Sequence, residues 1–367
     1  MDLELSDEQT WLADAVGTLL SRTWPPGTAR AADRRALWRS LVDFGALSVG
    51  GDEGLGAVEL CLVARALGAH LAPVPWLASA AVRFAVAPLG GQAPPAFAAL
   101  AGNGDAVALA MLEPGSRWGA ADLRTTVEPA AAGAVLDGRK VAVEHAHAAD
   151  LLAVVAAAPD GPALALVSTA AAGIAADAQP TFDETAPMHA VRFADVRLGE
   201  GTVAGGAAGA EALARLASIG GLLAAAEGVG AAGRLLDDAC RYASERRQFG
   251  RPIGSFQALR HLLADMYVRQ ASSWSSVLYA AAALDEDAGE AERTASIAKA
   301  YVSRASREVA HGAIQVFGGV AITAEHPAHR YLRRIVVRAQ QFGDAAHHER
   351  ALGRALAAAA SVPEPVR

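Results

Sequence analysis

The chain has 367 residues, of which 53% are hydrophobic, and 39 Asp and Glu against 32 Lys and Arg give it a formal net charge of -7. This length suffices for two or three packed domains, and the acidic balance argues against a nucleic-acid surface, which needs a broad basic face. Two cysteines, Cys61 and Cys240, exclude a disulfide framework. The N-terminus lacks a basic start followed by an apolar run, and no run of eighteen apolar residues appears, so we expect a soluble cytoplasmic protein with no membrane segment.

The first hundred residues are predicted to be helical. Ser6 is a candidate helix cap, because acidic residues follow it and apolar residues then recur at helical spacing. The stretch GAVELCLVARALGAHL repeats this spacing and ends before the prolines of APVPW. We therefore predict an N-terminal α-helical domain over residues 1–103.

The pattern of apolar residues changes after residue 103. Short β-compatible runs, AVALAML, LLAVVAA, ALALVS and AVRFADV, alternate with the expected turns EPGS, LDGRK and APDGP. This pattern predicts a central antiparallel β-barrel or sandwich over residues 104–205.

Long helical periodicity returns after an expected glycine-rich linker, GEGTVAGGAAGAE. Three segments between residues 222 and 317 are each longer than an average globular helix. We predict a C-terminal four-helix bundle over residues 206–367, which makes the chain an α+β multidomain protein.

Two motifs in the predicted bundle combine arginine with glycine. The stretch YASERRQFGRPIGSFQALRHLLADM places Arg246, Arg247 and Arg251 around Gln-Phe-Gly, and AIQVFGGVAITAEHPAHRYLRR carries two adjacent glycines and a pair of arginines. An arginine cluster alone is compatible with a solvated helix end. It also suits an anionic phosphate, because a guanidinium keeps its charge and offers a planar fork of donors.

Together the two motifs resemble the C-terminal bundle of the acyl-CoA dehydrogenases, and the three-part division of the chain is similar to the whole family. The resemblance implies FAD as the cofactor, lying between subunits, with the bundle of one subunit contacting the adenosine and pyrophosphate of its neighbour's flavin. By motif position, Arg246 would meet the pyrophosphate, Gln248 and Phe249 would line its edge, and Gln315, Gly318 and Gly319 would approach the adenosine half.

The catalytic base expected from the resemblance is missing. In most family members a Glu follows the second motif, but RAQQFGDAAHHER places Phe342 or Gly343 there. A minority carries the base about thirty residues before the Phe-Gly of the first motif, which falls on Gly220 or Gly221 here. None of these side chains can accept a proton. Glu227 lies two turns further along the same helix, too far to substitute.

The expected contacts to the flavin ring are altered as well. Leu112 stands where the family usually has a hydroxyl residue, and Ala142, Val143 and Glu144 stand where the resemblance places Trp-Ile-Thr. An alanine cannot cover a ring face, and a carboxylate beside the flavin would oppose the negative charge of its reduced form.

The resemblance therefore implies an accessory subunit of a hetero-tetrameric acyl-CoA dehydrogenase that desaturates a steroid or other bulky acyl-CoA. A paralogous catalytic subunit would supply the base and the ring pocket. One alternative is a self-sufficient homotetramer, acting on acyl-CoA or acyl-carrier-protein thioesters, with its base relocated to Glu113, Glu144 or Asp344. Another is a silent thioester-binding protein.

Three further expectations concern the cavity and its surroundings. The cavity should be shaped by residues 75–105, the turn at 113–118 and the first bundle helix, where Gly220 leaves room either for a substrate ring or for Phe342. The histidine pairs His326/His329 and His347/His348 lack a completing Cys or acidic set, so no metal is predicted. The tryptophans, including Trp38, Trp76, Trp118 and Trp274, are expected to be packing residues.

Overall fold

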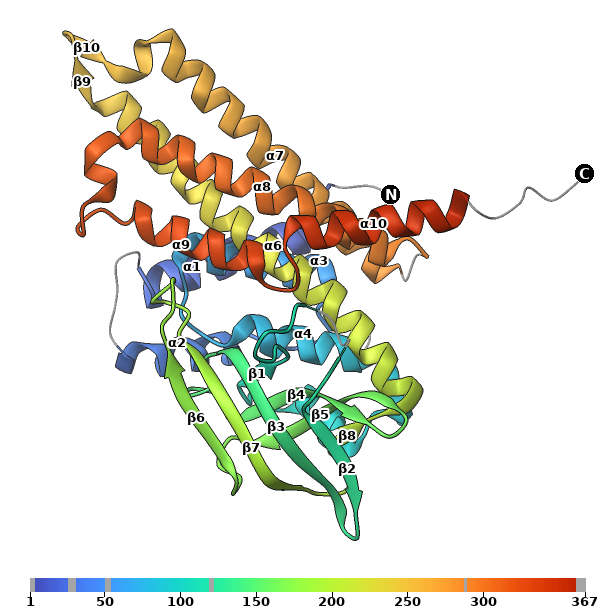
Figure 1. The fold of residues 1–367 in the computed structure, drawn as a ribbon. Coiled ribbons are helices and arrows are strands. Elements are labelled where there is room, and N and C mark those ends of the chain that lie inside the picture. The colour runs from blue at the N-terminus through green and yellow to red at the C-terminus, as the bar shows by residue number, and fades with distance from the viewer. Residues whose placement is uncertain (1–3, 26–30, 50–53, 119–121, 287–288, 361–367) are drawn as a thin grey trace, which may run out of the picture.

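The computed structural model describes residues 4–25, 31–49, 54–118, 122–286 and 289–360. A curved sheet lies at one end of the molecule and long helices lie at the other, with the N-terminal helices between them (Figure 1). This order confirms the predicted α+β class. The N-terminal elements are α1 (Asp7–Thr23), α2 (Ala31–Asp43), α3 (Ala57–His70), α4 (Trp76–Val86), η1 (Ala87–Gln92), α5 (Pro95–Ala98) and η2 (Ala99–Gly102).

The predicted start of α1 is confirmed. The Ser6 hydroxyl accepts from the backbone N of Gln9 (3.2 Å), and the Gln9 side chain accepts from the backbone N of Ser6 (3.0 Å). This reciprocal pair satisfies two of the amide donors that a helix start leaves free.

The central strands form one eight-stranded sheet in the order β6-β7-β3-β2-β4-β5-β8, with β1 on β4. Most neighbours are antiparallel as expected, but β1 and β2 both run parallel to β4, so the sheet is mixed. The strands are β1 (Val107–Ala110), β2 (Thr126–Ala130), β3 (Gly133–Glu144), β4 (Leu151–Ala158), β5 (Gly161–Ser168), β6 (Ile174–Gln179), β7 (Met188–Leu198) and β8 (Val203–Ala204).

The prediction of a turn at LDGRK is wrong, because these residues lie within β3. Gly138 has φ 144° and lies at a register shift between β3 and β7. A Cβ on Gly138 would lie 2.6 Å from the Cα of Thr125. The Asp-Gly pair therefore marks a β-bulge where another backbone approaches closely.

The bundle consists of α6 (Gly206–Glu245), α7 (Gln257–Asp285), α8 (Ala291–Phe317), α9 (Ala328–Gln340) and α10 (Ala345–Ala360). α6 begins inside the expected glycine-rich linker, so the second half of that stretch is helix. α6 is long and apolar enough to cross a membrane, but 78% of its most apolar window is buried within the fold, as in the core helix of a soluble protein. The boundaries at 103/104 and 205/206 stay predictions.

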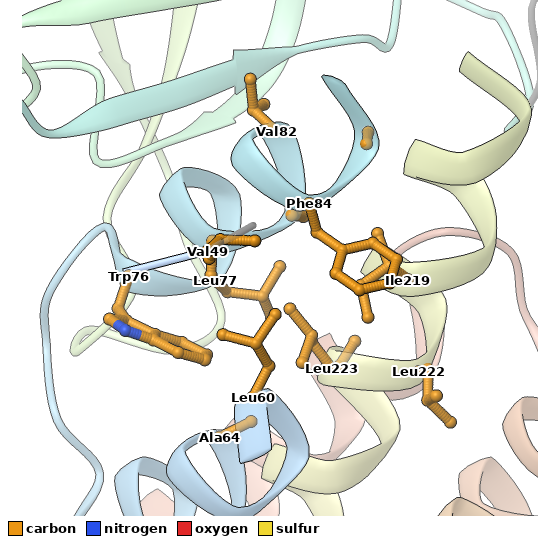
Figure 2. Close-up of a cluster of buried hydrophobic side chains, with 14 of the residues drawn as sticks. Val49, Leu60, Ala64, Trp76, Leu77, Val82, Phe84, Ile219, Leu222 and Leu223 are labelled. Carbon is orange, nitrogen blue, oxygen red and sulfur yellow. The ribbon is translucent and has the colours of Figure 1, made fainter. Parts of the chain in front are cut away.

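The largest hydrophobic core lies where α3, α4 and α6 meet. Figure 2 shows Leu60 of α3, Trp76 and Phe84 of α4, and Ile219 and Leu223 of α6 directed toward one another. Burying a side chain of this size stabilises a fold by roughly 1.5–3 kcal/mol. The Trp76 indole N–H also donates to the backbone O of Ala46 at 2.8 Å, so this tryptophan is a packing residue, as expected.

α3 and α6 touch backbone to backbone. A Cβ on Gly68 would lie 2.0 Å from the backbone O of Glu227, and one on Gly230 would lie 1.8 Å from the backbone O of Arg65. Only glycine fits at these two positions, because the atoms in the way belong to a neighbouring helix and cannot rotate aside.

Replacing Gly230 with alanine should force α3 and α6 apart. We expect G230A to lower the free energy of unfolding by about 1–3 kcal/mol, as overpacking does. The matched control is G228A, whose new Cβ would meet only the Ser306 Oγ at 3.9 Å and should be neutral or stabilising by up to about 1 kcal/mol. Denaturant unfolding measures both, and equal effects would contradict the close contact.

Candidate functional site

A small cavity lies between α4, the sheet and the turn from α9 to α10. Apolar side chains, among them Leu77, Met111 and Trp118, line one part of it, and Glu144 and Gln341 form its polar end. About 40 Å³ is open to water-sized molecules, room for roughly three waters. The cavity is thus near the expected segments, and Trp118 lines it instead of lying only in a core.

Phe342 fills the place that the resemblance gives to the base. Its ring stacks on Trp118 with centroids 5.2 Å apart, and the residue is only 7% exposed. A Cβ on Gly220 would lie 2.2 Å from Cε1 of Phe342. The two candidate base positions therefore face each other, and Gly220 makes room for Phe342, which decides between the two alternatives for that space.

Backbone strain is concentrated around the cavity. Ala142 (φ 53°), His145 (φ 57°) and Phe342 (φ 57°) all line it in left-handed conformations. Such a conformation costs a residue other than glycine about 1–2 kcal/mol. Strain of this kind gathers at functional sites, so the backbone here has the character of a site although the side chains differ from those expected.

Glu144 is engaged by two neighbours at the polar end. Arg338 donates to its two carboxylate oxygens at 2.6 and 2.9 Å, and the Gln341 side-chain amide donates at 2.6 Å. Burial acts to raise the pKa of Glu144, but the charge of Arg338 and its hydrogen bonds outweigh it and hold the pKa well below its usual range. Glu144 is therefore a fixed anion.

Glu227 is not a free carboxylate either. Its side chain, 5% exposed, accepts from Nε of Arg338 at 2.7 Å and from Arg334. Arg334 also pairs with Asp183 and donates to the Thr185 hydroxyl at 2.6 Å. We call the charged side chains Glu144, Asp183, Glu227, Arg334 and Arg338 the arginine network.

The remaining two carboxylates proposed as a relocated base are also committed to structural contacts. Glu113 accepts from the Lys140 ammonium at 2.8 Å and from the backbone N of Thr125 at 2.9 Å. Burial acts to raise its pKa, yet these hydrogen bonds lower it to about 2. Asp344 accepts from the backbone N of His347 at 2.7 Å at the start of α10.

The first arginine motif forms an exposed hairpin beyond the end of α6. Strands β9 (Arg247–Gln248) and β10 (Arg251–Pro252) pair around Phe249 and Gly250, which both have positive φ, at 51° and 77°. This is the geometry of a two-residue hairpin turn, where phenylalanine is unusual. Phe249 is 91% exposed, and Arg246 and Gln248 are exposed beside it.

The second motif lies at the same end of the bundle. Tyr242, one turn before the hairpin, packs edge-on against Phe317, the last residue of α8, with ring centroids 5.5 Å apart. Gln315 is exposed in the last turn of α8, and Gly318 and Gly319 open η4 (Gly318–Ile322). A Cβ on either glycine would meet nothing within 4 Å, so their backbone is open to a ligand from outside.

These observations test the fit of FAD in two parts. Exposed donors and open glycine backbone fit the anionic pyrophosphate and the neighbouring adenosine of a cofactor that would lie outside this chain. The cavity does not fit a flavin ring, because Phe342 stacks on Trp118 within it and the paired Glu144 carboxylate forms its polar end.

Sequence reasoning missed the arginine network. Its only local signal is the spacing of Arg330, Arg334 and Arg338 at every fourth residue of a helix, which places them on one face. Among the residues that the structure describes, no group of three or more His, Cys, Asp or Glu is arranged to hold a metal.

The chain is similar to proteins of one family. Residues 208–357 match the family described as acyl-CoA dehydrogenase, C-terminal domain. Acyl-CoA dehydrogenase IpdE2 of Mycolicibacterium smegmatis is 31% identical over 351 residues, which cover 92% of this chain and 96% of that one.

Solved structures agree with this similarity. A chain of the ChsE4-ChsE5 complex from Mycobacterium tuberculosis superposes with a TM-score of 0.83 at 28% identity, covering 99% of this chain and 100% of that one. A variant of the Tcur3481-Tcur3483 steroid ACAD gives a TM-score of 0.83 at 27% identity, covering 97% and 99%.

The packing of Phe342 against Gly220 predicts a strong coupling between the two positions. We expect G220A to lower the free energy of unfolding by about 1–3 kcal/mol, and the added methyl to cost little once F342A has removed the ring. G221A is the control, since its Cβ would lie 3.7 Å from the Phe342 Cβ. Denaturant unfolding of the double-mutant cycle measures the coupling, and simple additivity would contradict the contact.

Glu113 should make the fold sensitive to acid. A lowered pKa means that its contribution is present above the unfolded value near 4.5 and is lost as pH falls toward about 2. E113Q should therefore flatten that part of the stability curve. At pH 7 it should destabilise the fold by about 3–5 kcal/mol, because the Lys140 ammonium is left buried without its partner.

Denaturant unfolding between pH 7 and pH 2.5 measures the effect of E113Q. Replacement of the exposed Glu128 by glutamine serves as the control and should leave the acid slope unchanged. An E113Q slope equal to that of the unsubstituted chain would contradict the assignment.

Proposed function

The chain belongs to the acyl-CoA dehydrogenase family, and on that premise we propose that it is the non-catalytic subunit of an FAD-dependent acyl-CoA dehydrogenase complex. A paralogous subunit holds the catalytic base and the flavin ring. This chain supplies contacts to the adenosine and pyrophosphate of that subunit's FAD. When bound, FAD accepts the hydride that leaves the β-carbon of the acyl thioester.

The filled base position is the observation that carries this proposal. Removal of an α-proton needs an acceptor within hydrogen-bond reach. Phe342 and Gly220 provide none, and Glu113, Glu144, Glu227 and Asp344 are engaged elsewhere.

The distance between hairpin and cavity supports a second chain. α6 carries Gly220 beside the cavity and ends where Arg246 caps it. At 1.5 Å per residue the two positions lie about 39 Å apart along the helix axis. The hairpin therefore cannot reach the cavity of its own chain, and its donors face a site that another subunit would complete.

Phe249 supports the same conclusion. A phenylalanine that is 91% exposed and left-handed gains no burial while its backbone carries a cost of about 1–2 kcal/mol. Burial against a cofactor and a second chain would offset that cost.

Two of the similar structures are complexes named after two different chains. The ChsE4-ChsE5 pair supports a paralogous partner, and the Tcur3481-Tcur3483 steroid ACAD supports a steroid or other bulky acyl group in the substrate. A hetero-tetramer in the cytoplasm is the form that we propose for the complex.

Counting flavins in the co-expressed complex tests the proposal. We expect one FAD per two chains and no activity from this chain alone. R246M should weaken FAD retention by roughly tenfold or more, as expected for the loss of a charge-assisted hydrogen bond. R293M is the matched control, since Arg293 pairs with Glu290 at the opposite end of α8.

Each other outcome contradicts the proposal in a recognisable way. One FAD per chain with turnover by the lone chain would indicate a self-sufficient homotetramer. Tight binding of CoA thioesters without flavin would indicate a silent thioester-binding protein.

A further inference from the structure

One guanidinium joins the sheet to the bundle. Arg338 of α9 is 3% exposed and donates to Glu144, the last residue of β3, at 2.6 and 2.9 Å. Its Nε donates to Glu227 of α6 at 2.7 Å. A single side chain therefore connects three elements.

A second guanidinium, one helical turn earlier, makes a parallel connection. Arg334 is fully buried and pairs with Asp183, in the segment between β6 and β7, as well as with Glu227. It also donates to the Thr185 hydroxyl at 2.6 Å. Because residues four apart share a helix face, α9 presents both arginines to the sheet at once.

The network occupies the polar end of the cavity. Glu144 and Gln341 both line it, and the Gln341 side chain donates to Glu144 at 2.6 Å while accepting from Arg338. A flavin ring entering this cavity would meet the Glu144 carboxylate, which is already paired with Arg338.

Separating that pair is unfavourable. Glu227 and Arg338 are both buried, so removing one partner leaves the others as unpaired charges in a low dielectric. A ring that enters the cavity therefore gains no free cation at its polar end, and it would also have to displace the stacked Phe342.

We propose that the arginine network is a flavin-independent latch between the sheet and the bundle, which holds this subunit in its folded form with no flavin ring of its own. The inference deepens the proposed function and rests on it only for the location of the ring site. It assigns Arg338 as a positioning residue, because the guanidinium holds Glu144, which stands where the resemblance expects a contact to the flavin ring.

Hydrogen exchange in the co-expressed complex tests the latch. Amides of β3 and α9 in this chain should exchange at the same rate in the flavin-loaded and flavin-stripped complex. R338M should accelerate them roughly tenfold or more, because the junction opens locally. R304M is the matched control, since Arg304 pairs with Glu349 on the surface and should leave these amides unchanged.

A gentler variant covers the case in which R338M does not fold. E144Q keeps the shape of the side chain and removes its charge, so exchange in β3 and α9 should accelerate by less than with R338M. If flavin removal alone accelerates β3 and α9, the cofactor holds the junction and the proposal is wrong. Unchanged exchange in both variants would also overturn it.

The two proposals fail separately. The flavin count per tetramer and the effect of R246M report on the shared cofactor contacts. The exchange of β3 and α9 reports on the latch and needs no turnover, so a half-loaded complex with flavin-dependent exchange would reject the latch alone.

Discussion

The backbone contact between α3 and α6 is the constraint on which the rest of the structure depends. Gly68 and Gly230 allow the two helices to approach until a carbonyl of each occupies the place of a Cβ on the other. This contact fixes α6, and α6 carries Gly220 beside the cavity, Glu227 in the arginine network and the hairpin at its end. Loss of the contact would shift all three together.

Two kinds of interaction then close the cavity from opposite sides. On the apolar side, Phe342 stacks on Trp118 in space that Gly220 leaves empty. On the polar side, Arg338 pairs with Glu144 and Glu227. Phe342 at the expected base position and Glu144 at the expected ring position thus each have partners that fit them. Loss of side chains at random would not provide such partners.

Local sequence patterns predicted the features that short-range interactions along the chain determine. The cap at Ser6, the β-compatible runs and the long bundle helices are encoded within a few turns or strands, and the structure confirms them. The missing base at Gly220 and Phe342 was predicted from the family pattern. Whether Phe342 or a substrate ring fills the space at Gly220 stayed open, because no pattern relates positions so distant in sequence. The cofactor contacts assigned to Arg246 and Gln315 stay predictions.

The errors have physical reasons. The Asp-Gly of LDGRK has the composition of a turn, yet pairing of β3 with β7 outweighs that local preference and produces a bulge. The linker was assigned from its glycines, although α6 begins within it because packing on the sheet stabilises its first turns. In the arginine network, Arg338 contacts Glu227 and Glu144, which are 111 and 194 positions away in the sequence. The spacing of the arginines on α9 therefore indicates a shared helix face but does not identify their partners.

The number of residues in α6 sets both the distance and the rotation of the hairpin relative to the cavity. Each residue of an α-helix advances the axis by about 1.5 Å and turns it by about 100°. A single insertion between Gly230 and Arg246 would leave every contact at the cavity intact and yet rotate the hairpin by more than a quarter turn, so that Arg246 faced away from its present direction. The length of this helix therefore determines where Arg246 points. Insertions or deletions within it should be tolerated far less readily than substitutions on its surface.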